Sequence, residues 1–83
     1  MSNTLTRVKK VTAEVLKTDP AKIKDTAHFV RDLGAESIQS IELVAAFEEE
    51  FEIEMDEAAA LAVSTIDGAV KFIDQVLAQE KGK

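Results

Sequence analysis

The stretch that decides the fold is DLGAESIQSIELVAAFEEEF, residues 32–51, where a glycine-containing segment leads into a regular run of apolar side chains. At about 100° per residue, these side chains gather on one side of a helical wheel. The stripe consists of Leu43, Val44, Phe47 and Phe51. This spacing predicts an amphipathic helix from about Ser37 to Phe51 that turns one face to a hydrophobic core.

The same predicted helix carries more apolar surface than one core face needs. Ile38, Ile41 and Ala45 extend the apolar arc beyond the core stripe. The acidic side chains that border or interrupt this second edge are Glu42, Glu48 and Glu49. Apolar anchors inside a charged rim are typical of a recognition surface. A wide core face in a bundle with several neighbours gives the same pattern more often, so both interpretations stay open.

A first helix is predicted over about residues 4–17. It ends before Asp19-Pro20, because proline disfavours helical geometry in the residue that precedes it. The side chains expected to face inward are Leu5, Val8, Thr12, Val15 and Leu16.

A last helix is predicted over about residues 65–79, with one short helix at about residues 56–62 before it. Ser64 and Asp67 have the spacing of a capping box at the start of the last helix. The side chains expected to face inward are Ile66, Val70, Ile73 and Leu77.

The nineteen residues from 18 to 36 show no long helical pattern, and such loops in small domains are usually functional or wrongly assigned. Four apolar residues can hold the loop on the core: Ile23, Phe29, Val30 and Leu33. No strand alternation is convincing, so the sequence predicts an all-α fold, a four-helix bundle of three longer helices and one short helix, with a long anchored loop between the first two. One domain over residues 1–83 is expected, with an ordered core at about 4–79, because 83 residues cannot fill two cores.

The net charge of −6 is concentrated in the middle of the chain. Residues 31–57 hold ten acidic side chains and one basic one, whereas residues 1–30 have a net charge of +3. The overall sign argues against a nucleic-acid partner and an anionic membrane surface, and the acidic region suits a positively charged protein partner. No apolar run is long enough to span a membrane and the first residues lack a signal-peptide core, so we expect no membrane insertion and a cytoplasmic protein.

Ser37 is the candidate functional residue, at the start of the predicted helix. A serine there is most often a simple N-cap. However, Gly34 allows a tight backbone entry, and a helix amino terminus favours an attached phosphate. The chain has no cysteine, and its single histidine, His28, has the setting of an exposed loop residue. Neither a nucleophilic triad nor a zinc site can be assembled from these residues, so we expect no catalytic residue, no metal site and no enzymatic activity.

Residues 32–43, followed by residues 47–51, closely resemble the acyl carrier protein family, whose pattern reads D-L-G-A-D-S-L, then V-E-L and an E-E-E-F ending. Residues 27–30 and 64–66 resemble the family's loop and the start of its last helix, and the likeness covers about residues 5–79. The resemblance implies that a phosphopantetheinyl transferase attaches 4′-phosphopantetheine from coenzyme A to Ser37. It also implies that acyl intermediates are carried as thioesters on this arm, partly sheltered between the helices, and presented to fatty-acid, lipid or polyketide-type biosynthetic enzymes.

The resemblance further implies a docking surface for the basic patches of acyl-transfer and synthase enzymes, on a carrier expected to be a monomer. Its residues are Glu36, Ile38, Ile41, Glu42, Ala45, Glu48 and Glu49. Three residues depart from the family pattern: Glu36 replaces aspartate, while Gln39 and Arg31 stand where acids are common. These departures favour a specialised carrier over a housekeeping one. Two alternatives stay open, a carrier for aminoacyl or peptidyl groups and a protein-only helical interaction module in which Ser37 is a cap.

Overall fold

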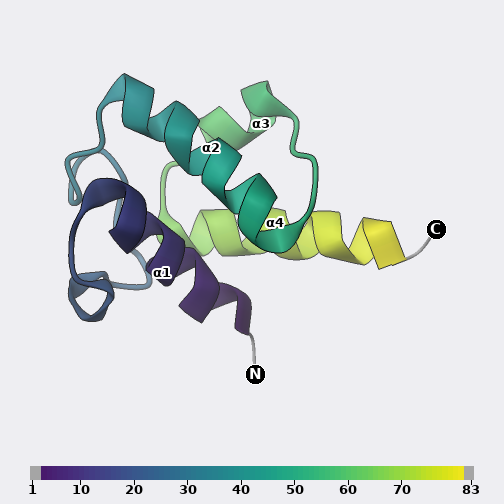
Figure 1. Ribbon diagram of the computed structural model, residues 1–83, viewed down its shortest axis with the longest axis horizontal. Coiled ribbons are helices and arrows are strands. Elements are labelled where there is room, and N and C mark those ends of the chain that lie inside the picture. The colour runs from purple at the N-terminus through teal and green to yellow at the C-terminus, as the bar shows by residue number, and fades with distance from the viewer. Residues whose placement is uncertain (1–2, 82–83) are drawn as a thin grey trace.

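Helices make up the core of the computed structural model, which describes residues 3–81 and the side chains of residues 4–79 (Figure 1). The elements in chain order are α1 (Asn3–Leu16), the 3₁₀ helix η1 (Pro20–Lys22), α2 (Ser37–Phe51), α3 (Glu57–Ala62) and α4 (Ile66–Lys81). Within residues 3–81 the only β-type pairing is an isolated bridge between His28 and Thr65. The predicted all-α bundle of three longer helices and one short helix is therefore confirmed.

The three longer helices enclose the core, because α1 packs against both α2 and α4, while α3 contacts α2. The predicted inward positions of α1 and α4 are buried or partly buried against this core. The four residues of the predicted α2 stripe are also buried. The side chains with no exposed surface are Val8, Thr12, Ile66 and Ile73.

The end of α1 lies one residue before its predicted end. Lys17 has a left-handed backbone conformation, with φ of 57°, that residues other than glycine rarely adopt, so the helix stops at Leu16. The Oδ1 atom of Asp19 then accepts the N–H of Ala21 at 2.9 Å and caps η1. This 3₁₀ turn was not predicted from the sequence.

The start of α4 differs from the predicted capping box by one residue. Thr65, rather than Ser64, caps the helix, because its Oγ1 accepts the N–H of Gly68 at 3.2 Å and donates to Asp67 Oδ1 at 2.6 Å. The carbonyl of Ser64 accepts the N–H of Phe29 at 2.9 Å. This hydrogen bond ties the backbone of Ser64 to the long loop, and α4 begins two residues later, at Ile66.

The long loop lies at one end of the bundle, next to the start of α2 (Figure 1). It is anchored as predicted, since Ile23 and Phe29 are buried and Leu33 packs against the core. The Phe29 ring lies 6.5 Å from the Phe47 ring, which joins the loop to α2. Val30 is 56% exposed, so its predicted role as an anchor is wrong.

Polar contacts tie the far ends of the helices together. Arg7 on α1 bonds to Glu50 through its Nε at 2.8 Å, and through Nη2 to the Glu50 carbonyl oxygen at 2.6 Å. Its guanidinium also lies 4.3 Å from the centre of the Phe51 ring. Thr4 donates to Asp74 of α4 at 2.6 Å. These contacts hold α1 against α2 and α4, and so help to hold α2 in position.

Candidate functional site

Ser37 is the first residue of α2 and its side chain is exposed. Glu36, rather than Ser37, is the N-cap, so the interpretation of Ser37 as a simple cap is wrong. Glu36 and Gln39 form a reciprocal capping box, in which Gln39 Oε1 accepts the N–H of Glu36 at 2.9 Å. No described residue forms a hydrogen bond with the Ser37 hydroxyl, because the capping role is filled by its neighbours.

The capping box also explains two of the departures noted in the sequence. A glutamate before the serine and a glutamine at the third helical position are a pair in which each side chain can accept the backbone N–H of the other residue across the first turn. They stabilise the amino terminus of α2 and place a neutral amide, in the case of Gln39, close to the serine.

A tight turn delivers the chain to this helix start. Gly34 has a left-handed φ of +71°, and its N–H donates to the carbonyl of Val30 at 3.0 Å. Ala35 follows, 95% buried, with its N–H bonded to the carbonyl of Phe29 at 2.9 Å. Because Ala35 is held in the core, Ser37 two residues later is fixed at the surface.

The second apolar edge of α2 is a surface and not part of the core. Ile38 is 66% exposed and Ile41 is 51% exposed, and Ala45 is also exposed. Leu43, between them in sequence, is only 4% exposed. The interpretation of a wide core face is therefore wrong for this edge, and its isoleucines form an apolar patch that runs from Ser37 along the helix.

The carboxylates of α2 differ in how freely they can meet a partner. Glu42 and Glu49 are exposed, as is Glu36 just before the helix, although the Glu36 side chain also takes part in the capping box. Glu48 is half-buried, and its Oε2 accepts the N–H of Met55 at 2.9 Å, which supports the connection to α3. Glu50 is held by Arg7. The structure thus separates carboxylates that stabilise the fold from those that remain open to solvent.

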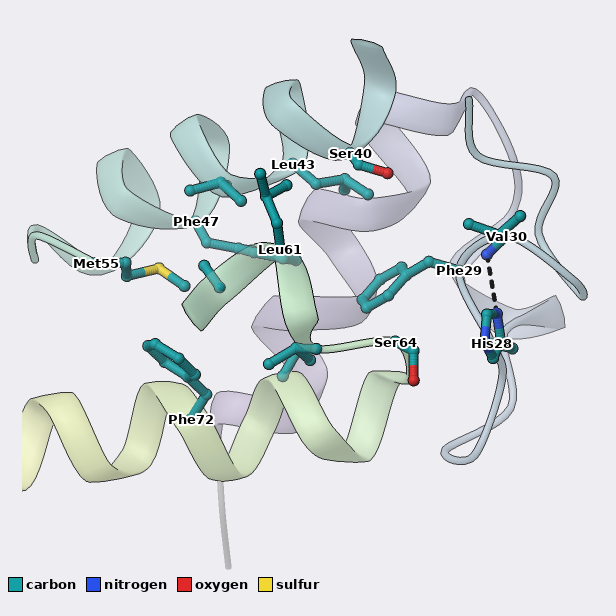
Figure 2. Close-up of a pocket in the computed structure, with 14 residues that line it drawn as sticks. His28, Phe29, Val30, Ser40, Leu43, Phe47, Met55, Leu61, Ser64 and Phe72 are labelled. Atoms are coloured by element: carbon teal, nitrogen blue, oxygen red, sulfur yellow. Dashed lines mark hydrogen bonds between the residues drawn. The ribbon is translucent and has the colours of Figure 1, made fainter. Parts of the chain in front are cut away.

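A pocket of about 110 Å³ lies between α2, α3, α4 and residues 28–30. Its walls are mainly apolar, with Met55 and Phe72 at one end and Ser40, Ser64 and His28 at the other (Figure 2). Ser40 is one helical turn from Ser37, so the polar end is the one nearer the serine. The sequence patterns did not locate this pocket. Its lining comes from four separate segments, and no spacing in the sequence distinguishes their apolar residues from those of the core.

His28 differs from its expected character as an exposed loop residue. It is half-buried and lines the pocket. Its Nδ1 accepts the backbone N–H groups of Val30 at 3.2 Å and of Arg31 at 3.1 Å. A histidine in the position of a turn cap, two and three residues before the donors, is the signal that could have identified this role.

Two further observations concern the described residues 3–81. No cluster of three or more histidine, aspartate or glutamate side chains there is placed to hold a metal ion. None of the helices there combines the length and the apolar character that crossing a membrane requires.

Comparison with known proteins assigns the class. A family model described as "Phosphopantetheine attachment site" matches residues 6–73. The chain is 49% identical over 77 residues to the acyl carrier protein of Phenylobacterium zucineum (strain HLK1), covering 93% of this chain and 98% of that relative. It is also 49% identical over 75 residues to the acyl carrier proteins of two Caulobacter vibrioides strains, NA1000 / CB15N and ATCC 19089 / CIP 103742 / CB 15, covering 90% of this chain and 96% of each relative.

The fold and the matched region define a phosphopantetheine-binding carrier domain. The chain belongs to the acyl carrier protein family; it is a carrier rather than an enzyme, and 4′-phosphopantetheine is its cofactor. A carrier of this kind works with the transferase and synthase enzymes that load and unload it.

Proposed function

We propose that Ser37 is the attachment residue for 4′-phosphopantetheine and that the chain uses it to move acyl groups between biosynthetic enzymes. The observation that carries this proposal is the exposed hydroxyl at the first residue of α2, left without a partner among the described residues because Glu36 and Gln39 cap the helix. An accessible hydroxyl on a rigid helix end fits a modifying enzyme that must enclose it.

Attachment replaces the Ser37 hydroxyl proton with a phosphodiester. The Oγ–P bond forms as the pyrophosphate bond of coenzyme A breaks and adenosine 3′,5′-bisphosphate leaves, while the proton passes to the transferase or to solvent. The amino terminus of α2 would favour the new negative charge through the helix dipole, although the capping box already pairs the N–H of Gln39. When attached, the arm supplies a thiol that can hold an acyl group as a thioester, which this cysteine-free chain cannot do alone.

The partner enzymes dock, in this proposal, on the exposed edge of α2 next to Ser37. Ile38 and Ile41 offer apolar contacts, and surrounding carboxylates attract basic patches of the partner. The proposed surface comprises Glu36, Ile38, Ile41, Glu42, Ala45, Glu48 and Glu49. Because Glu48 already accepts the Met55 N–H, we expect the exposed Glu42 and Glu49 to contribute more to docking.

The acyl cargo shelters, in this proposal, in the apolar pocket beneath α2. The pocket has its polar end on the side of the serine and is lined mainly by apolar side chains, which suits a hydrocarbon chain. Removing apolar surface from water stabilises the sheltered state by about 0.8 kcal/mol for each buried CH₂.

The proposed setting is fatty-acid, lipid or polyketide-type biosynthesis in the cytoplasm, with the chain acting as a monomer and as one domain over residues 1–83, ordered at about 4–79. The exposed Arg31, close in sequence to the attachment loop, reverses the charge that the family pattern has there and favours partners other than housekeeping synthases. Loading assays with acyl-activating and amino-acid-activating enzymes would separate an acyl carrier from an aminoacyl carrier.

The direct test is incubation of the purified chain with coenzyme A, magnesium and a broad-specificity phosphopantetheinyl transferase, followed by intact mass measurement. We expect the mass of one arm to be added to the unaltered chain and none to Ser37→Ala. Ser40→Ala, one turn further along α2, is the matched control and should be modified normally. No addition to the unaltered chain, or addition that survives Ser37→Ala, would refute the assignment.

A further inference from the structure

The side chain of His28 acts as the cap of a single helical turn. Its Nδ1 accepts the backbone N–H of Val30 at 3.2 Å (Figure 2) and that of Arg31 at 3.1 Å. The carbonyl of His28 accepts the N–H groups of Asp32 at 2.9 Å and Leu33 at 3.1 Å, which closes the turn. In return, the N–H of His28 donates to Asp32 Oδ2 at 2.7 Å.

This capping fixes the tautomer of the neutral imidazole. A nitrogen that accepts hydrogen bonds cannot also carry the proton, so Nδ1 is bare and the proton is on Nε2. Nε2–H is therefore a donor, and no described residue accepts a hydrogen bond from it. The turn holds the ring in place, so the donor has a fixed direction without having a partner in the chain.

The location of this donor is at the polar end of the pocket. His28 lines the pocket together with Ser40 and Ser64, whereas Met55 and Phe72 form the opposite end (Figure 2). The Ser40 hydroxyl already donates to the carbonyl of Glu36 at 3.3 Å. His28 is consequently the lining residue whose donor is both unused and held rigid by backbone contacts.

We propose that His28 is a positioning residue that donates a hydrogen bond from Nε2–H to a carbonyl oxygen of the tethered arm or of its cargo, at the polar end of the pocket. The inference rests on the proposed function of Ser37. An arm attached there carries amide carbonyls, and a loaded arm adds a thioester carbonyl. A carbonyl that leaves water without a new hydrogen-bond partner is destabilised, and the inner walls of the pocket offer mainly apolar side chains. A donor at the polar end of the pocket removes this penalty for a carbonyl that lies there.

The experiment is long-range ¹H–¹⁵N NMR of the imidazole of the whole ¹⁵N-labelled chain in three forms: unmodified, carrying the arm as a free thiol, and carrying a butyryl group on the arm. In the unmodified chain we expect the Nε2–H tautomer with bare Nδ1. If an amide of the arm accepts the bond, the Nε2 resonance shifts in the free-thiol form; if the cargo carbonyl accepts it, the shift appears only after butyryl loading.

The outcomes that overturn the inference are distinct from failure of the Ser37 assignment. An Nδ1–H tautomer in the unmodified chain, or an Nε2 resonance that is the same in all three forms, overturns the role of His28 while leaving the attachment site intact. Failure to add the arm, seen by intact mass, overturns the attachment site and the role of His28 with it.

A pair of variants separates positioning from folding. His28→Ser keeps a neutral side-chain acceptor for the turn but is too short to reach the arm, whereas His28→Ala removes both functions. With a ¹³C-carbonyl-labelled arm and cargo, we expect His28→Ser to melt close to the unaltered chain and yet return the bonded carbonyl resonance to its value in free coenzyme A or butyryl-coenzyme A. Thr6→Ala, which removes an exposed hydroxyl of α1 away from the pocket, is the control and should leave the resonance in place. An unchanged carbonyl resonance in His28→Ser contradicts the proposal.

Discussion

The two apolar sides of α2 carry the same kind of residues, but one side is buried and the other is exposed to solvent. Leu43 and Phe47 on one side are each 4% exposed, whereas Ile38 and Ile41 on the other are 66% and 51% exposed. The difference does not come from hydropathy, since isoleucine is as apolar as leucine. It comes from the neighbours, because α1 and α3 pack on α2 and Phe29 contacts Phe47 on the first side, while no described element covers the second. The comparison teaches that the first side holds the fold together and the second is available to a partner.

The largest expected effect comes from emptying the covered side. Phe47→Ala should lower the free energy of unfolding by about 3–5 kcal/mol, because it removes a buried ring that packs on Phe29 and leaves a cavity. Urea unfolding followed by circular dichroism measures this loss. A loss under about 1 kcal/mol would break the comparison, since Phe47 would then not be a core residue in energetic terms.

On the exposed side, Ile41→Ala should change the free energy of unfolding by less than about 0.5 kcal/mol. It should instead weaken the phosphopantetheinyl transferase reaction, raising KM about 5- to 10-fold if the side chain is a docking anchor worth about 1 kcal/mol or more. Steady-state kinetics on the variant and on the unaltered chain checks this. A destabilised fold with an unchanged KM is the opposite pattern and would assign Ile41 to the core.

Thr12 is the converse of the exposed isoleucines, because it is a polar residue with no exposed surface. No hydrogen-bond partner of its Oγ1 is found in the part of the chain that the structure describes. Thr12→Val keeps the shape and removes the unsatisfied hydroxyl, so we expect the free energy of unfolding to rise by about 1 kcal/mol. A lower melting temperature in Thr12→Val would show that the hydroxyl is satisfied in solution.

The smallest effect concerns the start of α4, which is capped differently from the start of α2. The hydrogen bond from the Thr65 hydroxyl lowers the pKa of the Asp67 carboxyl below its ordinary value of 3.8. Because the folded-state pKa is the lower one, this stabilisation is present above that ordinary value and is lost as the pH falls through the folded-state pKa. Between pH 5 and pH 3 the unaltered chain should therefore lose slightly more melting temperature than Asp67→Asn, and identical losses would contradict this reading of the cap.

The sequence predicted those parts of the molecule that depend on regular spacing. The bounds of α2 and the buried positions of all three longer helices follow from helical periodicity, since one face must meet the core. The helix ends were predicted less well. Lys17 stops α1 through an unusual backbone conformation, and Thr65 replaces Ser64 as a cap because the loop pairs with the backbone at Ser64.

For the site, the sequence indicated Ser37 but could not say whether its hydroxyl was occupied. That depended on the bond between Glu36 and Gln39, for which the sequence showed only two side chains of suitable type. The sequence did not decide whether Ile41 is buried in the core or exposed at the surface, because that depends on where the other helices lie. The capping role of His28 was missed, since it arises from the conformation of a loop without a periodic pattern.

The central claim is tested most directly on the chain as its own cells make it, by intact mass measurement followed by fragmentation to locate any added group. The account predicts one 4′-phosphopantetheine, free or acylated, on Ser37. Recovery of the chain only in unmodified form, or with the group on another residue, would contradict it.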